Sequence, residues 1–301
     1  MALPRHRVLY GLHVPNNDHA TIASLTRKTG YQPQIINIFI KLDTDAAHFS
    51  PTALRKINEL GATPMVTLEP WSWRSQWGVA GQPEYSLAAL ASGNWDNQLK
   101  NTARTIRSHR GIVYLRFAHE MNGWWYPWAE SVNGNRPGDY VRAWRHVHDL
   151  FRRSGCSNIR WIWSPNALTY SSRGTSNLAS LYPGDRYADV IGMTAYGHGS
   201  SAAETFDATL RALRAISHRP VVISETGVDG PRKAEWITSF GRYLRRHQEI
   251  MGFVWYNTPP SAPGAPDDYR FDDTPENLEA FRNALRVANV TSKTSTARVL
   301  G

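Results

Sequence analysis

The sequence has 301 residues, 41% of them hydrophobic, which is enough to bury the core of one large domain. It carries a formal charge of +9, but its arginines recur at helical spacing, as Arg104, Arg107 and Arg110 do, which indicates solvated helix faces rather than a nucleic-acid surface. The single cysteine, Cys156, excludes an internal disulfide, and no apolar segment reaches the length of a membrane span.

Segments typical of strands and helices alternate from the N-terminus onward. The expected strands span residues 8–14, 34–40, 63–69, 112–117, 159–163, 189–196, 220–225 and 251–256. The expected helices span residues 20–29, 51–60, 95–109, 139–153, 233–247 and 276–288. Residues 71–92 and 167–187 are expected to form long loops, which in compact domains are usually functional.

This order of elements predicts a closed (β/α)8 barrel over residues 1–288, followed by a loose polar tail over 289–301. No Gly-rich phosphate loop follows the first strand, so the sequence lacks the signature of a dinucleotide-binding fold. Catalytic groups of such barrels lie at the C-terminal ends of the strands. The residues expected there are Glu69, Glu120, Tyr196, Glu225 and Trp255.

The end of the fourth strand carries a dense group of polar and aromatic residues. Arg116, His119 and Glu120 precede a turn, and an aromatic run follows it, made of Trp124, Trp125, Tyr126 and Trp128. So many aromatic side chains are too crowded for an exposed loop unless a flat ligand covers them. Pyranose sugars present flat, partly apolar faces, so this segment indicates a carbohydrate site.

Two glutamates suit glycoside hydrolysis with retention of configuration. Glu120 and Glu225 are expected on opposite sides of the barrel mouth, and retention requires two carboxyl groups roughly 5–5.5 Å apart. Glu225 is the expected nucleophile. Glu120 is the expected acid/base, because an apolar, partly buried setting raises the pKa of a proton donor.

At these positions the chain resembles glycoside hydrolase family 26, whose members include β-mannanases and lichenases. The matching segments are residues 116–128, 161–166, 184–192 with Tyr196, and 224–227. The resemblance implies a (β/α)8 barrel, a retaining mechanism, and β-mannan or mixed-linkage β-glucan as the substrate. The segment 67–71 is more similar to the lichenase branch.

The resemblance also implies roles for individual residues. Glu120 is then the acid/base and Glu225 the nucleophile, and His119 lies beside the acid on the substrate side. Tyr196 supplies a hydroxyl that orients the nucleophile, so we expect it to donate a hydrogen bond to Glu225. The residues expected to bind the sugar chain are Glu69, Trp71, Trp124, Trp125, Trp128, Asn166 and Trp255, with Trp255 as the floor under the cleaved sugar.

Some of these side chains have alternative interpretations. Glu69 could equally pair with an arginine, and Arg116 is expected to position a carboxylate rather than to clamp the substrate. Trp161 and Trp163 alternate along one strand and could both be core. His146 and His148 lie two residues apart and share no helix face, so no metal site is expected, and no cofactor is expected either.

Two other functions remain open, a catalytically weak carbohydrate-binding barrel and a hydrolase of an acidic cell-envelope or exopolysaccharide glycan. In each case the expected partner is a polysaccharide or oligosaccharide, with no nucleic acid, and the expected state is a monomer. Residues 1–7 lack the apolar core of a signal peptide. We nevertheless expect a secreted or cell-surface protein whose leader is absent from this sequence, with the cytoplasm as the alternative.

Overall fold

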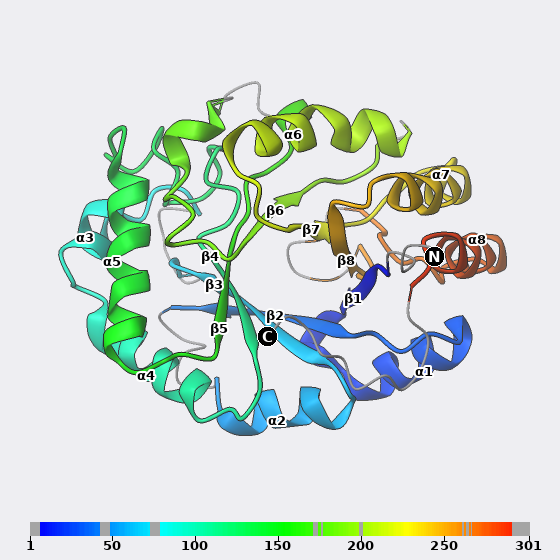
Figure 1. Ribbon diagram of the computed structural model, residues 1–301, viewed down its shortest axis with the longest axis horizontal. Coiled ribbons are helices and arrows are strands. Elements are labelled where there is room, and N and C mark those ends of the chain that lie inside the picture. Colours follow the sequence, from blue (N-terminus) through cyan, green and yellow to red (C-terminus); the bar gives the residue numbers. More distant parts are fainter. Residues whose placement is uncertain are drawn as a thin grey trace, which may run out of the picture.

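The computed structural model shows a closed barrel of parallel strands surrounded by helices (Figure 1). It describes residues 7–42, 49–72, 79–170, 174–175, 177–198, 201–260, 262, 265 and 267–290. Within these residues eight strands follow one another around the barrel in chain order, and β1 pairs with β8 to close it. The predicted (β/α)8 fold is therefore confirmed.

The strands are β1 (Leu9–His13), β2 (Ile35–Lys41), β3 (Thr63–Glu69), β4 (Val113–Phe117), β5 (Ile159–Trp163), β6 (Val190–Thr194), β7 (Val221–Thr226) and β8 (Ile250–Tyr256). The α-helices are α1 (His19–Thr29), α2 (Pro51–Glu59), α3 (Leu87–Ala91), α4 (Asp96–Arg107), α5 (Asp139–Arg153), α6 (Ala202–Ile216), α7 (Lys233–Arg246) and α8 (Pro275–Val287). Short 3-10 helices occur at Pro15–Asn17, Pro83–Tyr85, Leu168–Tyr170 and Leu178–Leu181. Among the described residues, no helix is both long and apolar enough to cross a membrane.

Side-chain caps account for several helix starts. Ser50 accepts a hydrogen bond from the Ala53 amide at the start of α2, and Pro51 occupies the first turn. Helix α6 was not predicted, although Ser201 and Glu204 form a reciprocal capping box at its start. That spacing is readable in the sequence and marks the missing helix. The short helix α3 lies inside a segment that was expected to be loop.

The inner face of the barrel carries one core residue from each of strands β2 to β8. These are Ile35, Met65, Tyr114, Ile162, Val190, Val222 and Val254. Because side chains alternate between the two faces of a strand, Arg116 and Tyr256 point inward as well. Trp161, Trp163 and Trp255 have the opposite phase and belong to the outer core against the helices, so the core interpretation of Trp161 and Trp163 is confirmed.

The last helix returns the chain to the start of the barrel. Helix α8 lies beside α7 on the outside of the barrel (Figure 1), and Val290 then forms a parallel bridge with Val8. Val290 is buried, so at least this part of the predicted tail packs against the fold. Residues 291–301, the rest of the predicted tail, lie outside the described residues.

Candidate active site

Arg116, on β4, connects the two carboxylates at the mouth of the barrel. Its Nη1 atom lies 2.6 Å from Oε2 of Glu225, on β7. Its Nη2 atom donates a hydrogen bond to the hydroxyl of Thr194, on β6, and Thr194 is also hydrogen-bonded to Glu120. Glu120 and Glu225 are therefore held in one polar network, although they are far apart in the sequence.

A bulge in β7 turns Glu225 into this network. Val222 points inward, so regular alternation would also place Ser224 inward and Glu225 outward. Thr194 pairs with Glu225 although Met193 pairs with Ile223, so Ser224 is one extra residue in β7. A bulge of this kind redirects the side chains that follow it, and here it allows both Ser224 and Glu225 to contact inward-facing groups.

The turn after β4 has an unusual backbone. Ala118 and Glu120 adopt φ values of +44° and +55°, a left-handed conformation that non-glycine residues seldom take. The turn is held by hydrogen bonds from the Tyr140 hydroxyl to the Ala118 carbonyl (3.0 Å) and from Trp128 Nε1 to the His119 carbonyl (2.6 Å). These contacts fix the direction in which the Glu120 side chain leaves the chain.

Glu120 lies in an apolar environment that keeps it protonated. Burial raises its pKa from the ordinary 4.5 to about 7, and the negative charge of Glu225 adds to the rise. Arg116 opposes the rise, as does Trp125, whose Nε1 donates to Oε2 of Glu120 at 2.8 Å. A carboxyl group with this pKa holds a proton near neutral pH and is able to donate it.

Both oxygens of Glu225 accept hydrogen bonds from fixed donors. Arg116 donates to Oε2, and the Tyr196 hydroxyl donates to Oε1 at 2.6 Å. The predicted hydrogen bond between Tyr196 and Glu225 is therefore present. The guanidinium and the hydroxyl together restrict the carboxylate to one orientation.

A third carboxyl group, that of Glu69, lies at the end of β3. It accepts a hydrogen bond from Trp71 Nε1 (3.1 Å), and its Oε1 lies 3.9 Å from Nε2 of His119. Burial raises the pKa of Glu69 to about 7. Burial, and then the charge of Arg116, lower the pKa of His119 well below 6.5, so its ring is neutral. The principal partner of Glu69 is thus Trp71 rather than an arginine.

Half-buried aromatic rings lie around the carboxyl groups. His13 stacks on Tyr256, with ring centroids 4.9 Å apart and an interplanar angle of 10°, and Phe39 meets both rings edge-on. The predicted site contained none of these three residues. They share the inward phase of β1, β2 and β8, so strand alternation is the signal that would have found them.

Two tryptophans predicted to bind sugar are instead core residues. Trp255 is 0% exposed because it has the outward phase of β8, where it packs among Phe240, Phe271 and Phe281. Trp128 is 0% exposed, stacked on Tyr126 at 4.3 Å. The prediction of a sugar-binding role is wrong for both, since a ring without exposed surface has no face for a ligand.

The remaining predicted residues differ in their exposure. Trp124 is 42% exposed, and Trp71 and Trp125 are half-buried, so these three rings have surface available to a ligand. Asn166 follows β5 and is buried; its backbone amide and carbonyl bond to the side chain of Asn122.

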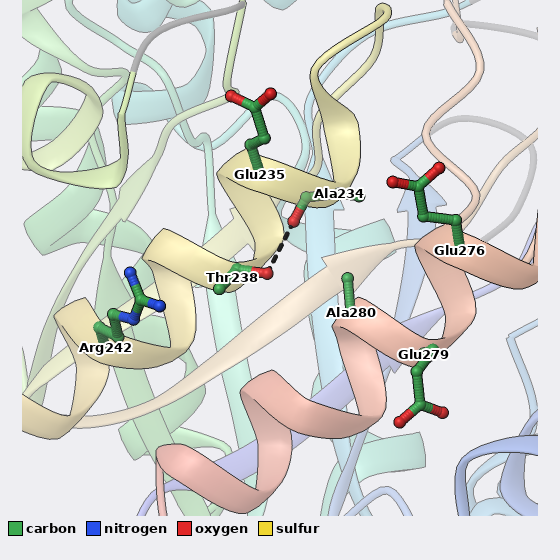
Figure 2. Close-up of a pocket in the computed structure, with 7 residues that line it drawn as sticks. All are labelled: Ala234, Glu235, Thr238, Arg242, Glu276, Glu279 and Ala280. Atoms are coloured by element: carbon green, nitrogen blue, oxygen red, sulfur yellow. Dashed lines mark hydrogen bonds between the residues drawn. The ribbon is translucent and has the colours of Figure 1, made fainter.

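A groove on the outside of the barrel, between α7 and α8, is separate from this site (Figure 2). It is lined by Ala234, Glu235, Thr238, Arg242, Glu276, Glu279 and Ala280. None of these residues lies at the barrel mouth. In the part of the chain that the structure describes, no cluster of three or more His, Cys, Asp or Glu side chains is arranged to hold a metal ion.

Known proteins resemble the chain in sequence and in fold. The family model described as glycosyl hydrolase family 26 matches residues 89–227. Endoglucanase H of Acetivibrio thermocellus is 30% identical over 281 residues, which cover 88% of this chain and 29% of that protein. A mannan endo-1,4-beta-mannosidase of Bacillus subtilis is 27% identical over 191 residues, 52% of this chain and 50% of its own. The chain thus spans half or less of the length of these relatives.

Among solved structures, a β-mannanase of the same family from Bacteroides ovatus has a similar fold, with a TM-score of 0.73. It is 16% identical, and the match covers 96% of this chain and 91% of that one. Identity this low bears on the fold alone.

Proposed function

Because the chain belongs to glycosyl hydrolase family 26, we propose that it is a retaining glycoside hydrolase that cleaves internal β-linkages of a polysaccharide. One observation carries this proposal, the different environments of two carboxyl groups in a single network. Burial favours the protonated form of Glu120, whereas Glu225 is paired with Arg116 and accepts a hydrogen bond from Tyr196. A double displacement needs this division into a proton donor and a nucleophile.

In the first step, a carboxylate oxygen of Glu225 attacks the anomeric carbon while Glu120 donates its proton to the glycosidic oxygen. The bond between that carbon and oxygen breaks, one part of the polysaccharide leaves, and a glycosyl ester forms on Glu225. In the second step, Glu120, now ionised, takes a proton from water. The water oxygen attacks the same carbon and releases Glu225, which restores both residues and retains the β-configuration.

Within the β-mannan and mixed-linkage β-glucan class, we propose a β-glucan as the substrate. Endoglucanase H, named for activity on a glucan, matches 88% of the chain, whereas the mannosidase of Bacillus subtilis matches 52%. β-Mannan is the second candidate, since it is the substrate named for that mannosidase.

Two alternative functions differ in the residues and charges that they require. A barrel that only binds carbohydrate needs the aromatic rings but no buried proton donor, and Glu120 argues against it. A hydrolase of an acidic glycan would use the formal charge of +9 to attract its substrate. Anionic polysaccharides therefore belong in the substrate panel.

The proposal extends to the setting of the protein. We propose a secreted or cell-surface location, because a polysaccharide too large to enter a cell must be cut outside it. A monomeric catalytic domain over residues 1–288 with a tail over 289–301 is part of the same proposal.

The test is hydrolysis of soluble mixed-linkage β-glucan, β-mannan and an acidic polysaccharide by the wild type and by Glu225→Ala. Glu279→Ala is the matched control, since it removes an exposed glutamate whose surface ion pair with Arg282 contributes little. We expect wild type and control to release β-configured oligosaccharides and Glu225→Ala to release none. Products of inverted configuration, or equal activity in all three proteins, would contradict the proposal.

A further inference from the structure

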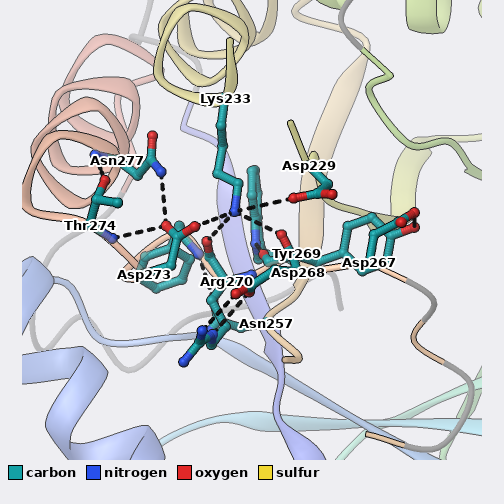
Figure 3. A network of polar contacts seen from close by, with 12 residues as sticks. Asp229, Lys233, Asn257, Asp267, Asp268, Tyr269, Arg270, Asp273, Thr274 and Asn277 are labelled. Atoms are coloured by element: carbon teal, nitrogen blue, oxygen red, sulfur yellow. Dashed lines mark hydrogen bonds and ion pairs between the residues drawn. The ribbon is translucent and has the colours of Figure 1, made fainter. Parts of the chain in front are cut away.

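Lys233, the first residue of α7, is a buried cation outside the proposed catalytic pair. Its side chain is 3% exposed, and its ammonium lies 2.6 Å from Oδ2 of Asp273 and 3.9 Å from Oδ1 of Asp229. It also donates to the carbonyl oxygens of Asp268 (2.7 Å) and Arg270 (3.1 Å), as Figure 3 shows. Burial of an ammonium is costly unless its donors are satisfied, and here they are.

The two carbonyls that Lys233 binds stand on either side of Tyr269. The backbone of Tyr269 itself is also held, because its amide donates to the Thr258 carbonyl (3.0 Å) and its carbonyl accepts from Trp255 Nε1 (2.7 Å). The segment between β8 and α8 is thereby fixed at the residue whose ring turns toward the barrel mouth. The hydrogen bond from Trp255 Nε1 to the Tyr269 carbonyl means that Trp255 also helps to hold this loop.

The ring of Tyr269 packs against Tyr196. Their centroids are 4.6 Å apart. Gly227 lies under both rings, since a Cβ atom there would stand 3.1 Å from Tyr269 and 3.3 Å from Tyr196, tighter than ordinary contact. Tyr196 in turn donates its hydroxyl to Glu225 at 2.6 Å. A displacement of Tyr269 would therefore release the ring that carries this hydroxyl.

We propose that Lys233 is a positioning residue for the reaction, which acts through Tyr269 and Tyr196 to hold the hydroxyl donor on Glu225. The inference rests on the proposed function, in which Glu225 is the nucleophile. The ammonium of Lys233 contacts Asp229, Asp273 and the backbone beside Tyr269 rather than Glu225. Its effect is carried by two packed side chains and by the backbone that its ammonium binds.

Lys233→Met tests this, because it keeps an unbranched side chain only one atom shorter and removes the three N–H donors. The matched control is Lys28→Met, which removes the ion pair between Lys28 and Asp272 (2.6 Å) on the same loop without touching the carbonyls beside Tyr269. We expect kcat of Lys233→Met to fall about tenfold or more, with KM changed less than about twofold, because a nucleophile loses orientation in the transition state. Lys28→Met should match the wild type.

A double variant separates positioning from a general loss of structure. In a Tyr196→Phe background, where the hydroxyl is absent, Lys233→Met should cause no further fall in kcat, whereas a general loss of structure would lower kcat in both backgrounds.

Several outcomes would overturn the inference. These are an unchanged kcat in Lys233→Met, an equal fall in kcat in Lys28→Met, or an undiminished fall in the Tyr196→Phe background. If Lys233→Met does not fold, Tyr269→Leu replaces it, since this variant keeps the backbone contacts and removes the ring. An unchanged kcat in Tyr269→Leu then overturns the inference.

A readout without activity distinguishes this inference from the proposed function. A crystal structure of Lys233→Met, or of Tyr269→Leu if needed, should show the Tyr196 hydroxyl displaced from its 2.6 Å contact with Glu225. An unchanged contact would overturn the positioning role, whatever the catalytic activity of the variant. A wild type without activity on any glycan would instead count against the proposed function alone.

Discussion

The guanidinium of Arg116 and the carboxylate of Glu225 form an ion pair of 2.6 Å in which the two side chains are 0% and 10% exposed. Neither charge has enough water around it to be stable without the other. The same guanidinium reaches Thr194, which is hydrogen-bonded to Glu120, so one arginine organises both carboxyl groups.

Arg116→Met should destabilise the fold by about 3–5 kcal/mol, because it leaves the buried carboxylate of Glu225 without its partner. Urea unfolding at pH 7 measures the loss. In the double variant Arg116→Met with Glu225→Gln, which has neither charge, most of the lost stability should return. A double variant as unstable as the single one would show that the pairing is not the cause.

Trp125→Phe should move the alkaline limb of the kcat/KM profile to higher pH. The indole N–H stabilises the ionised form of Glu120 at 2.8 Å and so lowers its pKa, which burial has raised to about 7. Removal of this donor lets the pKa rise further, and the acid stays protonated to higher pH. Trp124→Phe, at the exposed neighbouring ring, is the control and should leave the limb in place; equal shifts in both would contradict the assignment.

Glu120→Gln should stabilise the protein at alkaline pH. Below pH 4.5 the wild-type carboxyl is protonated in both the folded and the unfolded chain, so its titration does not affect stability there. Between 4.5 and about 7 the unfolded chain ionises first, and the wild-type fold loses stability as the pH rises. Melting temperatures should therefore differ by a few degrees at pH 8 and coincide at pH 4. A constant difference at both values would show that the effect is not ionisation of this group.

Trp255→Ala should lower folding stability, whereas Tyr256→Ala should weaken substrate binding. Trp255 is fully buried in the outer core, so its truncation should cost about 3–5 kcal/mol of folding stability. Tyr256 is half-buried at the mouth, and its loss should raise KM about threefold to tenfold, the equivalent of about 0.5–1.5 kcal/mol of ring contact. Thermal unfolding and initial rates on the same glucan measure both; an unchanged KM in Tyr256→Ala would remove that ring from the binding surface.

Azide should restore the activity of Glu120→Ala and thereby show which carboxyl group is the acid/base and which is the nucleophile. Without its acid, the variant should lose about 100- to 10,000-fold in activity on natural glycans, but an aryl glycoside with a good leaving group should still form the glycosyl-enzyme. Azide needs no deprotonation, so it should restore turnover and yield a β-glycosyl azide. If azide instead rescues Glu225→Ala, with an α-azide as product, the two roles are exchanged.

The sequence by itself determined the class of fold and most of the chemically active groups. Period-two strands and capped helices are local patterns, because backbone geometry and capping act over a few residues. The predicted strands therefore coincide with the observed ones to within a few residues. The carboxyl groups at the ends of β3, β4 and β7 were found for the same reason, since a strand end is visible in the chain.

Only the tertiary structure decided where these side chains point. Trp255 and Tyr256 are adjacent, and which of them faces the barrel mouth depends on the phase of β8, which barrel closure sets. Glu225 reaches Arg116 because of a bulge that pairing with β6 reveals. Lys233, Tyr269 and Tyr196 are distant in sequence, and their contact forms when β8, α7 and the loop before α8 pack together. The reason is physical, since strand phase and long-range contacts are set by packing across the whole barrel and not by neighbours in the chain.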